Sequence, residues 1–586
     1  MAGLRELFPF LDLRGVRRSD VARDLTSAAA VAVLAIPQGV AYAMIAGLPP
    51  AMGLYAVCAP ALVGSLFRSS RHVITGPTNA LSLLVGAAVA ARAGFSPTET
   101  ALLLALLVGL LQVAAGLLRL GVLVDYISTP VVLGYITGAG VLIGVGQLPN
   151  LSATAGGGEH LPGQILAWVE GLGAASPLSL GIGLGAAVLL LLLRRIDRRI
   201  PGAIVMLAVV TGLSWGLDLG AHGVPRIMDL APIPLGLPPL TAPSLAGWTE
   251  LLPAAVAAAV LSLVESSAVA RSTSARTGQR LELSTEFVGQ GLANLAAAFT
   301  GAYPTSGSLS RSAVNEQTGA RTRLSGAASG LAMLAVVAVL GPVVNYAPVS
   351  ALAGLLLVVA ADLVDLARIR SILASRRSDA VAFIVTMLGT WAMPLDEAIY
   401  VGVAISLVLF LHRARLLPSS RIVVGRDGEL ATAELDDPLR AGECPSIRVV
   451  HVEGHLFFGA AGELRAVLDE LVADAAVKVV ILRLKWAQNL DYTAAVVLQT
   501  VQARLAAQGR TMLLVGMRSD ALEVLERTGV ADAFGEHQLF PARSRWFEAL
   551  SQAIAAALEL VEPHACGPAC PLARYLERAR ELGRDC

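Results

Sequence analysis

The chain has 586 residues, of which 55% are hydrophobic and 15% are charged. Soluble chains carry roughly 25% charged residues, so this composition excludes an ordinary soluble protein and indicates one that sits in lipid. The formal net charge is zero, so no overall field favours nucleic acid as a partner.

Residues 1–23 contain no short apolar run that ends in a small-residue cleavage site, so we expect no cleavable signal peptide and a cytoplasmic amphipathic lead-in. Long apolar runs recur from residue 24 to residue 415, the expected transmembrane transport domain. They include 98–118, 177–193, 201–219, 251–270, 325–344, 348–361, 379–394 and 396–412. Because a spanning helix needs about 20 mostly apolar residues, these runs and several shorter ones predict about fourteen crossings.

The arginines indicate which side of the membrane each loop faces. Clusters stand before the first predicted span and after the sixth, eighth, tenth, twelfth and fourteenth. They are Arg14, Arg17, Arg18 and Arg23; Arg194, Arg195, Arg198 and Arg199; Arg271, Arg276 and Arg280; Arg321 and Arg323; Arg368, Arg370, Arg376 and Arg377; and Arg413 and Arg415. Because loops rich in Lys and Arg stay in the cytoplasm, both ends of the membrane domain are expected there.

Two short segments interrupt the apolar pattern in the same way. Residues 75–80 are Thr-Gly-Pro-Thr-Asn-Ala and residues 303–308 are Tyr-Pro-Thr-Ser-Gly-Ser, and each precedes a helix too short to cross a membrane. They fall in the third and tenth spans, matched positions in a seven-plus-seven inverted repeat. Such paired, Gly/Pro-interrupted segments indicate a transporter binding site; a loop at the membrane surface is the alternative.

The beginnings of the two half-helices are candidate substrate-binding positions. They comprise Thr78 and Asn79 in the first segment, and Ser308, Leu309, Ser310 and Arg311 in the second. Two facing helix N-termini bring free N–H groups and positive dipole ends together, an arrangement that binds an anion. Arg311, about one turn into its helix, would add a permanent positive charge; a snorkelling or helix-stabilising arginine is the alternative.

Glu265 stands deep inside the eighth predicted span, ahead of Arg271. An ionisable residue at that depth is a functional candidate. Burial and a nearby Arg311 act on its charge in opposite senses, so we expect Glu265 to exchange a proton during transport. A fixed ion pair between Glu265 and Arg311 is the structural alternative. Sodium prefers several oxygen ligands, yet Ala268 and Val269 stand one turn further on, which favours protons over sodium.

Gln38 and Tyr42 stand four residues apart in the first span and therefore share one helix face. Neutral polar groups of this kind suit the lining of a cavity, although a helix–helix hydrogen bond and an interfacial anchor are alternatives. Pro37 and Gly39 are expected to loosen the helix there.

The composition changes after Pro418. Segments 447–452, 478–484 and 511–517 are short, apolar and rich in branched residues, and predict strands. Helical patterns occupy 461–472, 493–508 and 519–528. Strands that alternate with helices indicate a small α/β domain, which we place at 416–562, followed by a polar tail at 563–586.

The five cysteines show no paired framework, as suits a reducing compartment. His564, Cys566 and Cys570 could hold a metal, but a closed structural zinc site needs four ligands, so we expect a loose tail and no cofactor or metal.

These motifs together resemble the sulfate permease (SulP) family of anion transporters over about residues 8–560. The resemblance rests on residues 36–43 (Ile-Pro-Gln-Gly-Val-Ala-Tyr-Ala), 47–50, 53–55, 75–77 and 307–315, and on the position of Glu265. The α/β part resembles a STAS domain, the usual C-terminal partner in that family.

The resemblance implies a polytopic α-helical membrane protein, with fourteen spans in an inverted repeat divided into core and gate domains. It implies an elevator-like movement of the core, a homodimer, and an anion site lined by Gln38, Tyr42, Thr78, Ser310 and Arg311. Sodium-coupled relatives place a hydroxyl where this chain has Val269, which argues against sodium.

In STAS domains a loop of the form Asp-x-Ser/Thr-Gly opens a helix, and in some the hydroxyl is phosphorylated. Here the loop begins at Asp491, a good N-cap, but Ala494 replaces the glycine. Phosphorylation of Thr493 is therefore less expected than a role in docking and regulating the membrane part.

The expected function is secondary transport of a small inorganic or carboxylate anion, with sulfate or a dicarboxylate favoured, by proton-coupled symport. An anion exchanger, an uncoupled anion conductance or a bicarbonate transporter would use the same site. A nucleobase permease shares the architecture but tends to carry a carboxylate where this chain has Ser310 and Arg311. An enzyme is not expected. The chain is expected to be a multi-pass protein of a bacterial inner membrane, with its N-terminus and STAS domain in the cytoplasm.

Overall fold

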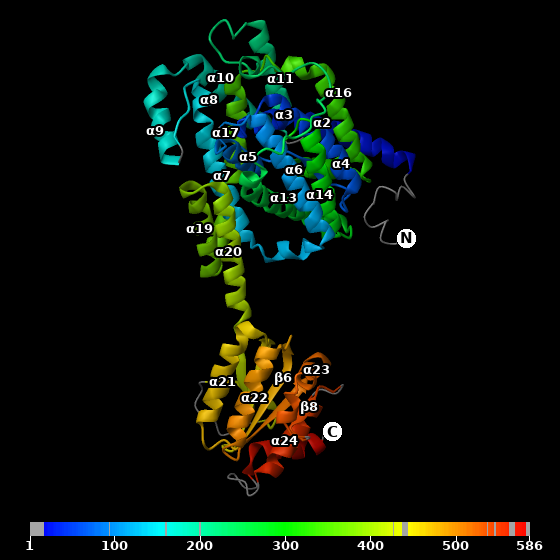
Figure 1. Cartoon of the computed structure of the whole chain (residues 1–586), viewed down its shortest axis with the longest axis vertical. Coiled ribbons are helices and arrows are strands. Elements are labelled where there is room, and N and C mark those ends of the chain that lie inside the picture. The colour runs from blue at the N-terminus through cyan, green and yellow to red at the C-terminus, as the bar shows by residue number, and fades with distance from the viewer. Residues whose placement is uncertain are drawn as a thin grey trace. The chain divides into compact units, whose positions relative to one another are not determined.

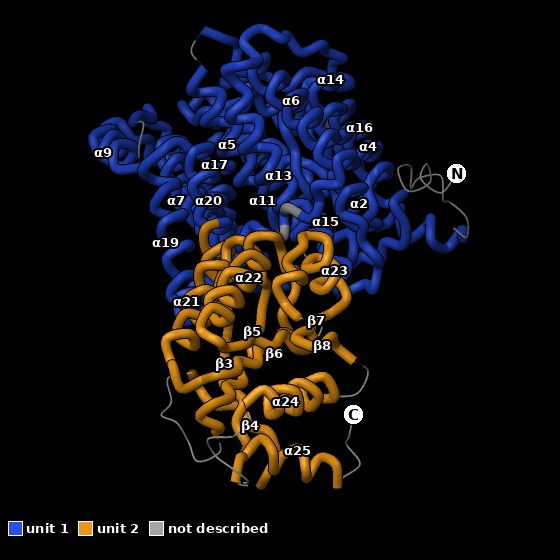
Figure 2. The backbone as a smooth tube through the Cα atoms, turned by 60° about the horizontal axis from the view of Figure 1, so that its bottom comes forward, with its two compact units in different colours: residues 1–407 blue, residues 408–586 orange. Residues whose placement is uncertain are grey.

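The computed structural model describes residues 17–92, 94–158, 161–197, 201–425, 427–435, 443–535, 537–543, 547–561 and 569–581. It divides into two compact units, Met1–Leu407 and Val408–Cys586, which we name the membrane unit and the C-terminal unit (Figure 2). His564, Cys566, Cys586 and most of the predicted lead-in lie outside the described residues.

The membrane unit is built from helices, with two short strands between them (Figure 1). In its first half they are α2 (Arg18–Ile45), α3 (Pro50–Tyr55), α4 (Ala59–Phe67), β1 (Ile74–Gly76), α5 (Asn79–Ala90), α6 (Pro97–Leu117), η2 (Leu120–Tyr126), α7 (Thr129–Gly146), α8 (Leu148–Ser152), α9 (Leu161–Gly171), η3 (Leu172–Ala174), α10 (Pro177–Ile196) and α11 (Gly202–Gly216). In its second half they are α12 (Ile227–Leu230), α13 (Trp248–Thr277), α14 (Leu283–Phe299), β2 (Ser306–Ser308), α15 (Leu309–Gln317), α16 (Leu324–Val344), α17 (Val349–Leu363), α18 (Leu366–Leu373), α19 (Arg377–Ala392) and α20 (Leu395–Ala414). The boundary between the two units falls inside α20, after Leu407.

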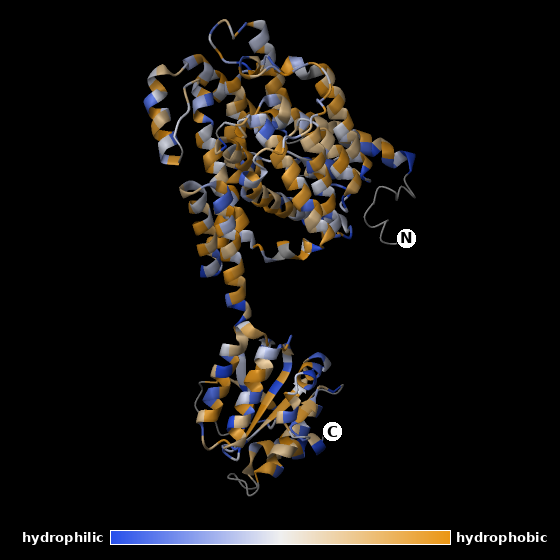
Figure 3. Ribbon diagram, viewed as in Figure 1, coloured by the Kyte–Doolittle hydropathy of each residue, from blue (hydrophilic) through white to orange (hydrophobic). Residues whose placement is uncertain are grey.

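Within the described residues, eight helical segments are long and apolar enough to cross a membrane, and three shorter apolar helices accompany them. Outward-facing side chains on these helices are apolar: Val188 is 54% exposed, Val339 69% and Val408 63%. Figure 3 shows such residues along most of the helix lengths. Exposed apolar faces of this extent mark contact with lipid, which confirms the predicted polytopic fold. The count of fourteen spans stays a prediction.

Helix α2 is continuous from Arg18 to Ile45 with Pro37 inside it, so the expected loosening at Pro37 and Gly39 takes a different form. Gly39 lies against the backbone of Gly53 in α3: a Cβ on Gly39 would meet the carbonyl oxygen of Gly53 at 2.7 Å. The two glycines therefore let α2 and α3 approach backbone to backbone, a contact that no larger residue allows.

The C-terminal unit holds a six-stranded sheet in the order β4-β3-β5-β6-β7-β8. Its elements are β3 (Ser419–Val424), β4 (Leu430–Ala433), β5 (Ile447–His455), η4 (Phe458–Ala460), α21 (Ala461–Ala473), β6 (Val479–Gln488), α22 (Tyr492–Ala506), β7 (Thr511–Met517), α23 (Ser519–Arg527), η5 (Ala531–Ala533), β8 (Leu539–Pro541), α24 (Glu548–Leu560) and α25 (Pro571–Glu581). Strands β5 to β8 are parallel, and β3 pairs antiparallel with both β4 and β5. The three predicted strands and three predicted helices are confirmed.

Alternation along the parallel strands gives the sheet two buried faces. Val480, Leu482 and Leu514 pack with α21, α22 and α23, whereas Ile481 and Leu513 pack with α24 and α25.

The expectation of a loose polar tail was wrong for α25. Leu572, Tyr575, Leu576 and Ala579 fall on one face of that helix and are buried on the sheet, and Cys570 is buried beside them. Four apolar side chains at helical spacing outweigh the polar composition of the segment.

Candidate functional site

The two interrupted segments of the sequence meet in the structure. Strand β1 pairs antiparallel with β2, with Ile74 opposite Ser308 and Gly76 opposite Ser306. Helix α5 begins three residues after β1 and α15 begins directly after β2, so both helices start at this two-stranded bridge. The bridge thus holds two helix N-termini close to one another inside the membrane unit.

The caps of these helices leave positive dipole ends at the bridge. The N-cap of α5 is Thr78, whose side chain makes no capping hydrogen bond, and Asn79 Oδ1 accepts from the N–H of Ala80 at 2.9 Å. The N-cap of α15 is Ser308, whose hydroxyl accepts from the N–H of Arg311 at 3.4 Å. The remaining first-turn N–H groups have no partner within their own helix.

Arg311 is fully buried and reaches across to the other segment. Its Nη2 donates to the carbonyl oxygen of Pro77 at 2.8 Å, and its Nη1 donates to Gln38 Oε1 at 3.0 Å. Its Nε, among the described residues, has no hydrogen-bond partner. Both partners are neutral oxygens, and no carboxylate among the described residues forms an ion pair with Arg311.

Two glycines, which lack a Cβ, allow the close approach of Arg311 to β1 and of β2 to α13. A Cβ on Gly76 would meet Arg311 Nη2 at 2.7 Å, and a Cβ on Gly307 would meet Ser266 Cα at 2.9 Å. The guanidinium therefore lies directly on the backbone of β1, and β2 lies directly on α13.

Glu265 lies at the start of α5. Its Oε2 accepts from the hydroxyl of Thr78 at 2.9 Å, and no ion pair of the described residues joins it to Arg311. The alternative of a fixed Glu265–Arg311 pair is therefore not what the structure contains. The carboxyl contacts Thr78 and the guanidinium contacts Gly76 and Pro77, so both groups lie against the first interrupted segment.

Gln38 and Tyr42 enter from α2. Gln38 Nε2 donates to Ser310 Oγ at 3.3 Å, and Tyr42 is 7% exposed one turn further on. Ser310 and Leu309 are exposed at the first turn of α15. Hydrogen bonds thus join Gln38, Ser308, Ser310 and Arg311 into one group and Thr78 and Glu265 into another. Leu309 points its side chain outward.

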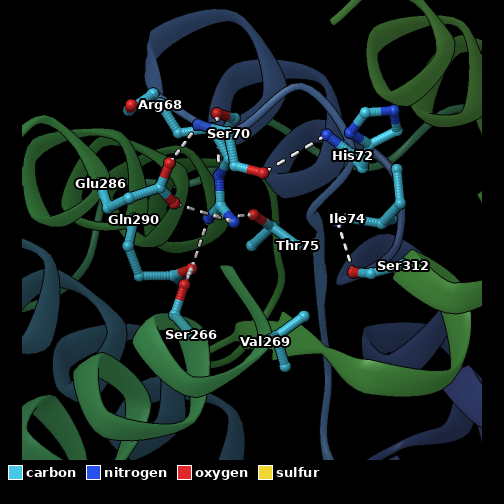
Figure 4. A network of polar contacts seen from close by, with 12 residues as sticks. Arg68, Ser70, His72, Ile74, Thr75, Ser266, Val269, Glu286, Gln290 and Ser312 are labelled. Carbon is cyan, nitrogen blue, oxygen red and sulfur yellow. Dashed lines mark hydrogen bonds and ion pairs between the residues drawn. The ribbon is translucent and has the colours of Figure 1, made fainter. Parts of the chain in front are cut away.

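Sequence reasoning missed the polar groups behind the bridge. Glu286, Gln290 and Asn294 stand at four-residue intervals on one face of α14, and Arg68 joins them from the end of α4. Figure 4 shows the Arg68 guanidinium beside Thr75 of β1 and close to the side chains of α14. The interval of four in an otherwise apolar helix is the signal that could have found this network.

A separate cavity of about 530 Å³ lies between α2, α3, α11 and α16. Its lining, which includes Leu54, Leu207, Trp215 and Val337, carries no charged side chain, so it provides no positive charge to attract an anion. Among the described residues no cluster of three or more His, Cys, Asp or Glu side chains could hold a metal, and His564 and Cys566 lie outside them.

The arrangement can bind an anion by three means at once: two helix dipoles, several backbone N–H groups, and one guanidinium with a free N–H. A buried cation without a counter-charge is costly, and an incoming anion removes that cost.

Comparisons with known proteins agree with this geometry. The model of the sulfate permease family matches residues 21–386, and the model of the STAS domain matches residues 440–545. A protein named probable sulfate transporter from Mycobacterium tuberculosis (strain CDC 1551 / Oshkosh) is 30% identical over 534 residues, covering 89% of this chain and 93% of that protein. A sodium-independent sulfate anion transporter from Bos taurus is 28% identical over 541 residues, covering 86% of this chain and 85% of that protein.

Among solved structures, murine solute carrier 26 family member A9, an anion transporter in the inward-facing state, superposes with a TM-score of 0.83. The two chains are 20% identical, and the match covers 95% of each, so the shared feature is the fold of the whole chain.

Proposed function

The chain belongs to the sulfate permease family of anion transporters and contains a STAS domain, and on that premise we propose that it carries sulfate or a small dicarboxylate in symport with protons. One observation carries the anion site. Arg311 is 0% exposed, bonds only to neutral oxygens, and keeps one N–H without a partner among the described residues, beside two helix N-termini. A dianion is the solute that best balances such a pocket.

The proposed binding residues are Gln38, Tyr42, Thr78, Asn79, Ser308, Leu309, Ser310 and Arg311. Gln38 and Ser310 would meet the anion at the mouth of the pocket, because both are at least partly exposed and bonded to each other. Arg311 would meet it from within.

The test is an uptake panel in proteoliposomes with sulfate, bicarbonate, succinate and chloride, in which Arg311→Ala is the control. We expect saturable sulfate or succinate uptake that Arg311→Ala lowers about a hundredfold or more, since a charge-assisted hydrogen bond is worth roughly 1.5–3 kcal/mol and two or three are lost. A panel in which Arg311→Ala transports as wild type contradicts the site.

Glu265 is the proposed proton carrier. It stands at the start of α5 with Thr78 as its donor, so a change in its charge would alter the groups that surround the anion. We predict that Glu265→Gln keeps anion–anion counterflow but abolishes accumulation driven by an inward proton gradient, measured as internal acidification with a trapped pH dye. Equal loss of both activities would make Glu265 a structural residue.

An anion exchanger, an uncoupled conductance or a bicarbonate transporter is the second candidate, because the same dipoles and arginine would serve any of them. Counterflow in the absence of a pH gradient identifies an exchanger, and bilayer current identifies a conductance. We do not favour sodium coupling, since Val269 stands where a hydroxyl ligand would be needed; uptake that rises with a sodium gradient would reverse this.

For assembly and placement, we propose an elevator-like movement of a core against a gate domain, a seven-plus-seven repeat, and a homodimer in a bacterial inner membrane. The transport domain would cover residues 24–415 and the STAS domain 416–562. The arginine clusters support a cytoplasmic N-terminus and STAS domain, which protease protection of the N-terminus in sealed cells would test.

A further inference from the structure

Arg68 is a second fully buried arginine of the membrane unit, and it does not face the anion site. It follows α4 directly. Its Nη2 donates to Thr75 Oγ1 and to Gln290 Oε1, each at 2.7 Å, and its Nη1 pairs with Glu286 Oε2 at 3.8 Å. Figure 4 shows these side chains converging on the guanidinium. A buried charge without partners is costly, so Arg68 favours the arrangement in which these partners surround it. The arginine therefore joins the end of α4 to β1 and α14.

The same face of α14 also holds β2. Gln290 Nε2 donates to the carbonyl oxygen of Thr305 at 2.8 Å, and Asn294 Oδ1 accepts from the N–H and the hydroxyl of Thr305 at 2.6 and 2.9 Å. Gln290 thus contacts Arg68 through its oxygen and the segment before β2 through its nitrogen. One stripe of α14 therefore fixes both strands of the bridge.

The loop that precedes β1 is fixed as well. Glu286 Oε1 accepts from the N–H of Ser70, and Gln279 Nε2 donates to the carbonyl oxygen of Ser69 at 2.8 Å. A Cβ on Gly289 of α14 would meet the Cα of Arg68 at 2.7 Å, so the backbones touch. This packing leaves β1 little room to shift.

A short covalent path leads from this network to the anion site. Thr75, which bonds to Arg68, is followed by Gly76, on which the Arg311 guanidinium lies, and by Pro77, whose carbonyl accepts from Arg311. Any displacement of Thr75 would move both contacts of Arg311 with β1 and the start of α5.

We propose that Arg68 and Glu286 are positioning residues of the anion site. Their pair sets where β1 and β2 stand, and so how well Arg311 and the two helix starts fit the anion, although neither residue touches it. The inference rests on the proposed function, because its transport readout needs a transported anion.

The test uses the full chain with the double variant Arg68→Met/Glu286→Leu, which removes both charges of the pair together. Thr75→Val, which keeps the pair but removes its acceptor in β1, is the second variant. Arg68→Lys keeps the positive charge but loses the planar guanidinium that bonds to two acceptors at once, so it is not expected to function like the wild type. Arg194→Gln is the matched control, because it breaks an exposed Arg–Asp pair with Asp362.

Two quantities are measured: amide hydrogen exchange of residues 73–79 and 305–311, with α17 as an internal reference, and the KM and maximal rate of sulfate uptake in proteoliposomes. We expect the double variant to lose at least tenfold in protection at the bridge and to gain at least tenfold in KM, while α17 is unchanged. Thr75→Val should shift both in the same direction by less.

The outcomes separate the positioning role from the transport function. A raised KM with unchanged protection of both segments, or lost protection with unchanged KM, overturns the positioning role while the transport function stands. Wild-type protein that takes up no anion overturns the proposed function, and exchange at the bridge then still decides whether the pair holds β1. Should the double variant fail to fold, Thr75→Val and Arg68→Lys decide between the same outcomes.

Discussion

Arg311 and Gly76 pack against each other in the proposed anion site. The guanidinium stands over the Cα of Gly76, and an added Cβ would be 2.7 Å from its Nη2 and 3.1 Å from its Cζ. A glycine at this position therefore does more than permit a turn: it lets a charged group lie on the strand.

We predict that Gly76→Ala pushes Arg311 off Pro77 and lowers anion affinity about ten- to a hundredfold, the equivalent of one charge-assisted hydrogen bond. The measurement is competitive uptake at varied anion concentration. Gly181→Ala in α10 is the matched control, since its Cβ would meet nothing within 4 Å. Equal effects of the two alanines would refute the role assigned to Gly76.

At this scale the sequence points to the residues of the proposed anion site but not to the groups that hold them in place. Arg311 and Glu265 stand out because charged groups are rare in apolar helices, and Thr78 stands out because it belongs to a Gly/Pro-interrupted segment. Pro77 acts through its backbone carbonyl and Gly76 through a missing atom, and neither property is visible as a side-chain pattern. The polar residues of α14 do not stand out, because each alone looks like an ordinary polar residue.

Single elements of the C-terminal unit follow their sequence closely. Asp491 caps α22 by accepting from the N–H of Ala494 at 2.9 Å, as its position predicts. Strands β3, β4 and β8 escape prediction because they are short and lie toward the edges of the sheet, where pairing with a neighbour rather than local pattern decides the structure. Helix α25 escapes for a related reason, since its apolar face is narrow.

That face gives a prediction at the scale of the element. Leu572 is 2% exposed against the sheet, so Leu572→Ala should lower the free energy of unfolding of the C-terminal unit by about 2–5 kcal/mol. Urea-dependent pulse proteolysis of the full chain, with detection of the C-terminal fragment, measures it. Glu577→Ala, at an exposed position of the same helix, should change the midpoint little. If α25 did not pack on the sheet, the two variants would have the same urea midpoint, and the prediction would be wrong.

For the whole molecule, stability of the C-terminal unit should depend on pH through His451. Burial, reinforced by the nearby Arg483 charge, holds the pKa of this histidine below its usual range. Below pH of about 6.5 the unfolded chain therefore binds a proton that the folded unit resists. The free energy of unfolding then decreases as the pH is lowered, by up to ~1.4 kcal/mol for each pH unit. Above pH of about 6.5 the contribution is constant.

The check is the urea midpoint of that unit between pH of about 5.5 and 7.5, a window that brackets the ordinary histidine pKa. His451→Gln should flatten the dependence, whereas replacement of the exposed His455 by Gln should preserve it. A midpoint that falls equally in the wild type and in His451→Gln would assign the dependence to other groups.

The type of architecture could be predicted from the sequence more readily than the number of membrane-spanning helices. Composition and arginine placement indicate a polytopic chain, and alternating patterns indicate the α/β unit. Eight described segments meet the length and hydropathy of a spanning helix, fewer than the fourteen crossings predicted. The number is lower because half-helices such as α5 are short and α14 carries a polar stripe. The elements that build a membrane site are thus those that look least like membrane helices.

The pairing of β1 with β2 has a consequence for biosynthesis. The two strands are separated by about 230 residues, and a ribosome adds roughly 5–20 residues each second, so β1 waits on the order of 10–50 s for its partner. During that interval the newly inserted α5 has a polar beginning and no companion strand within the bilayer. The nascent chain must therefore be sheltered by the insertion machinery or by water until Ser308 has been translated.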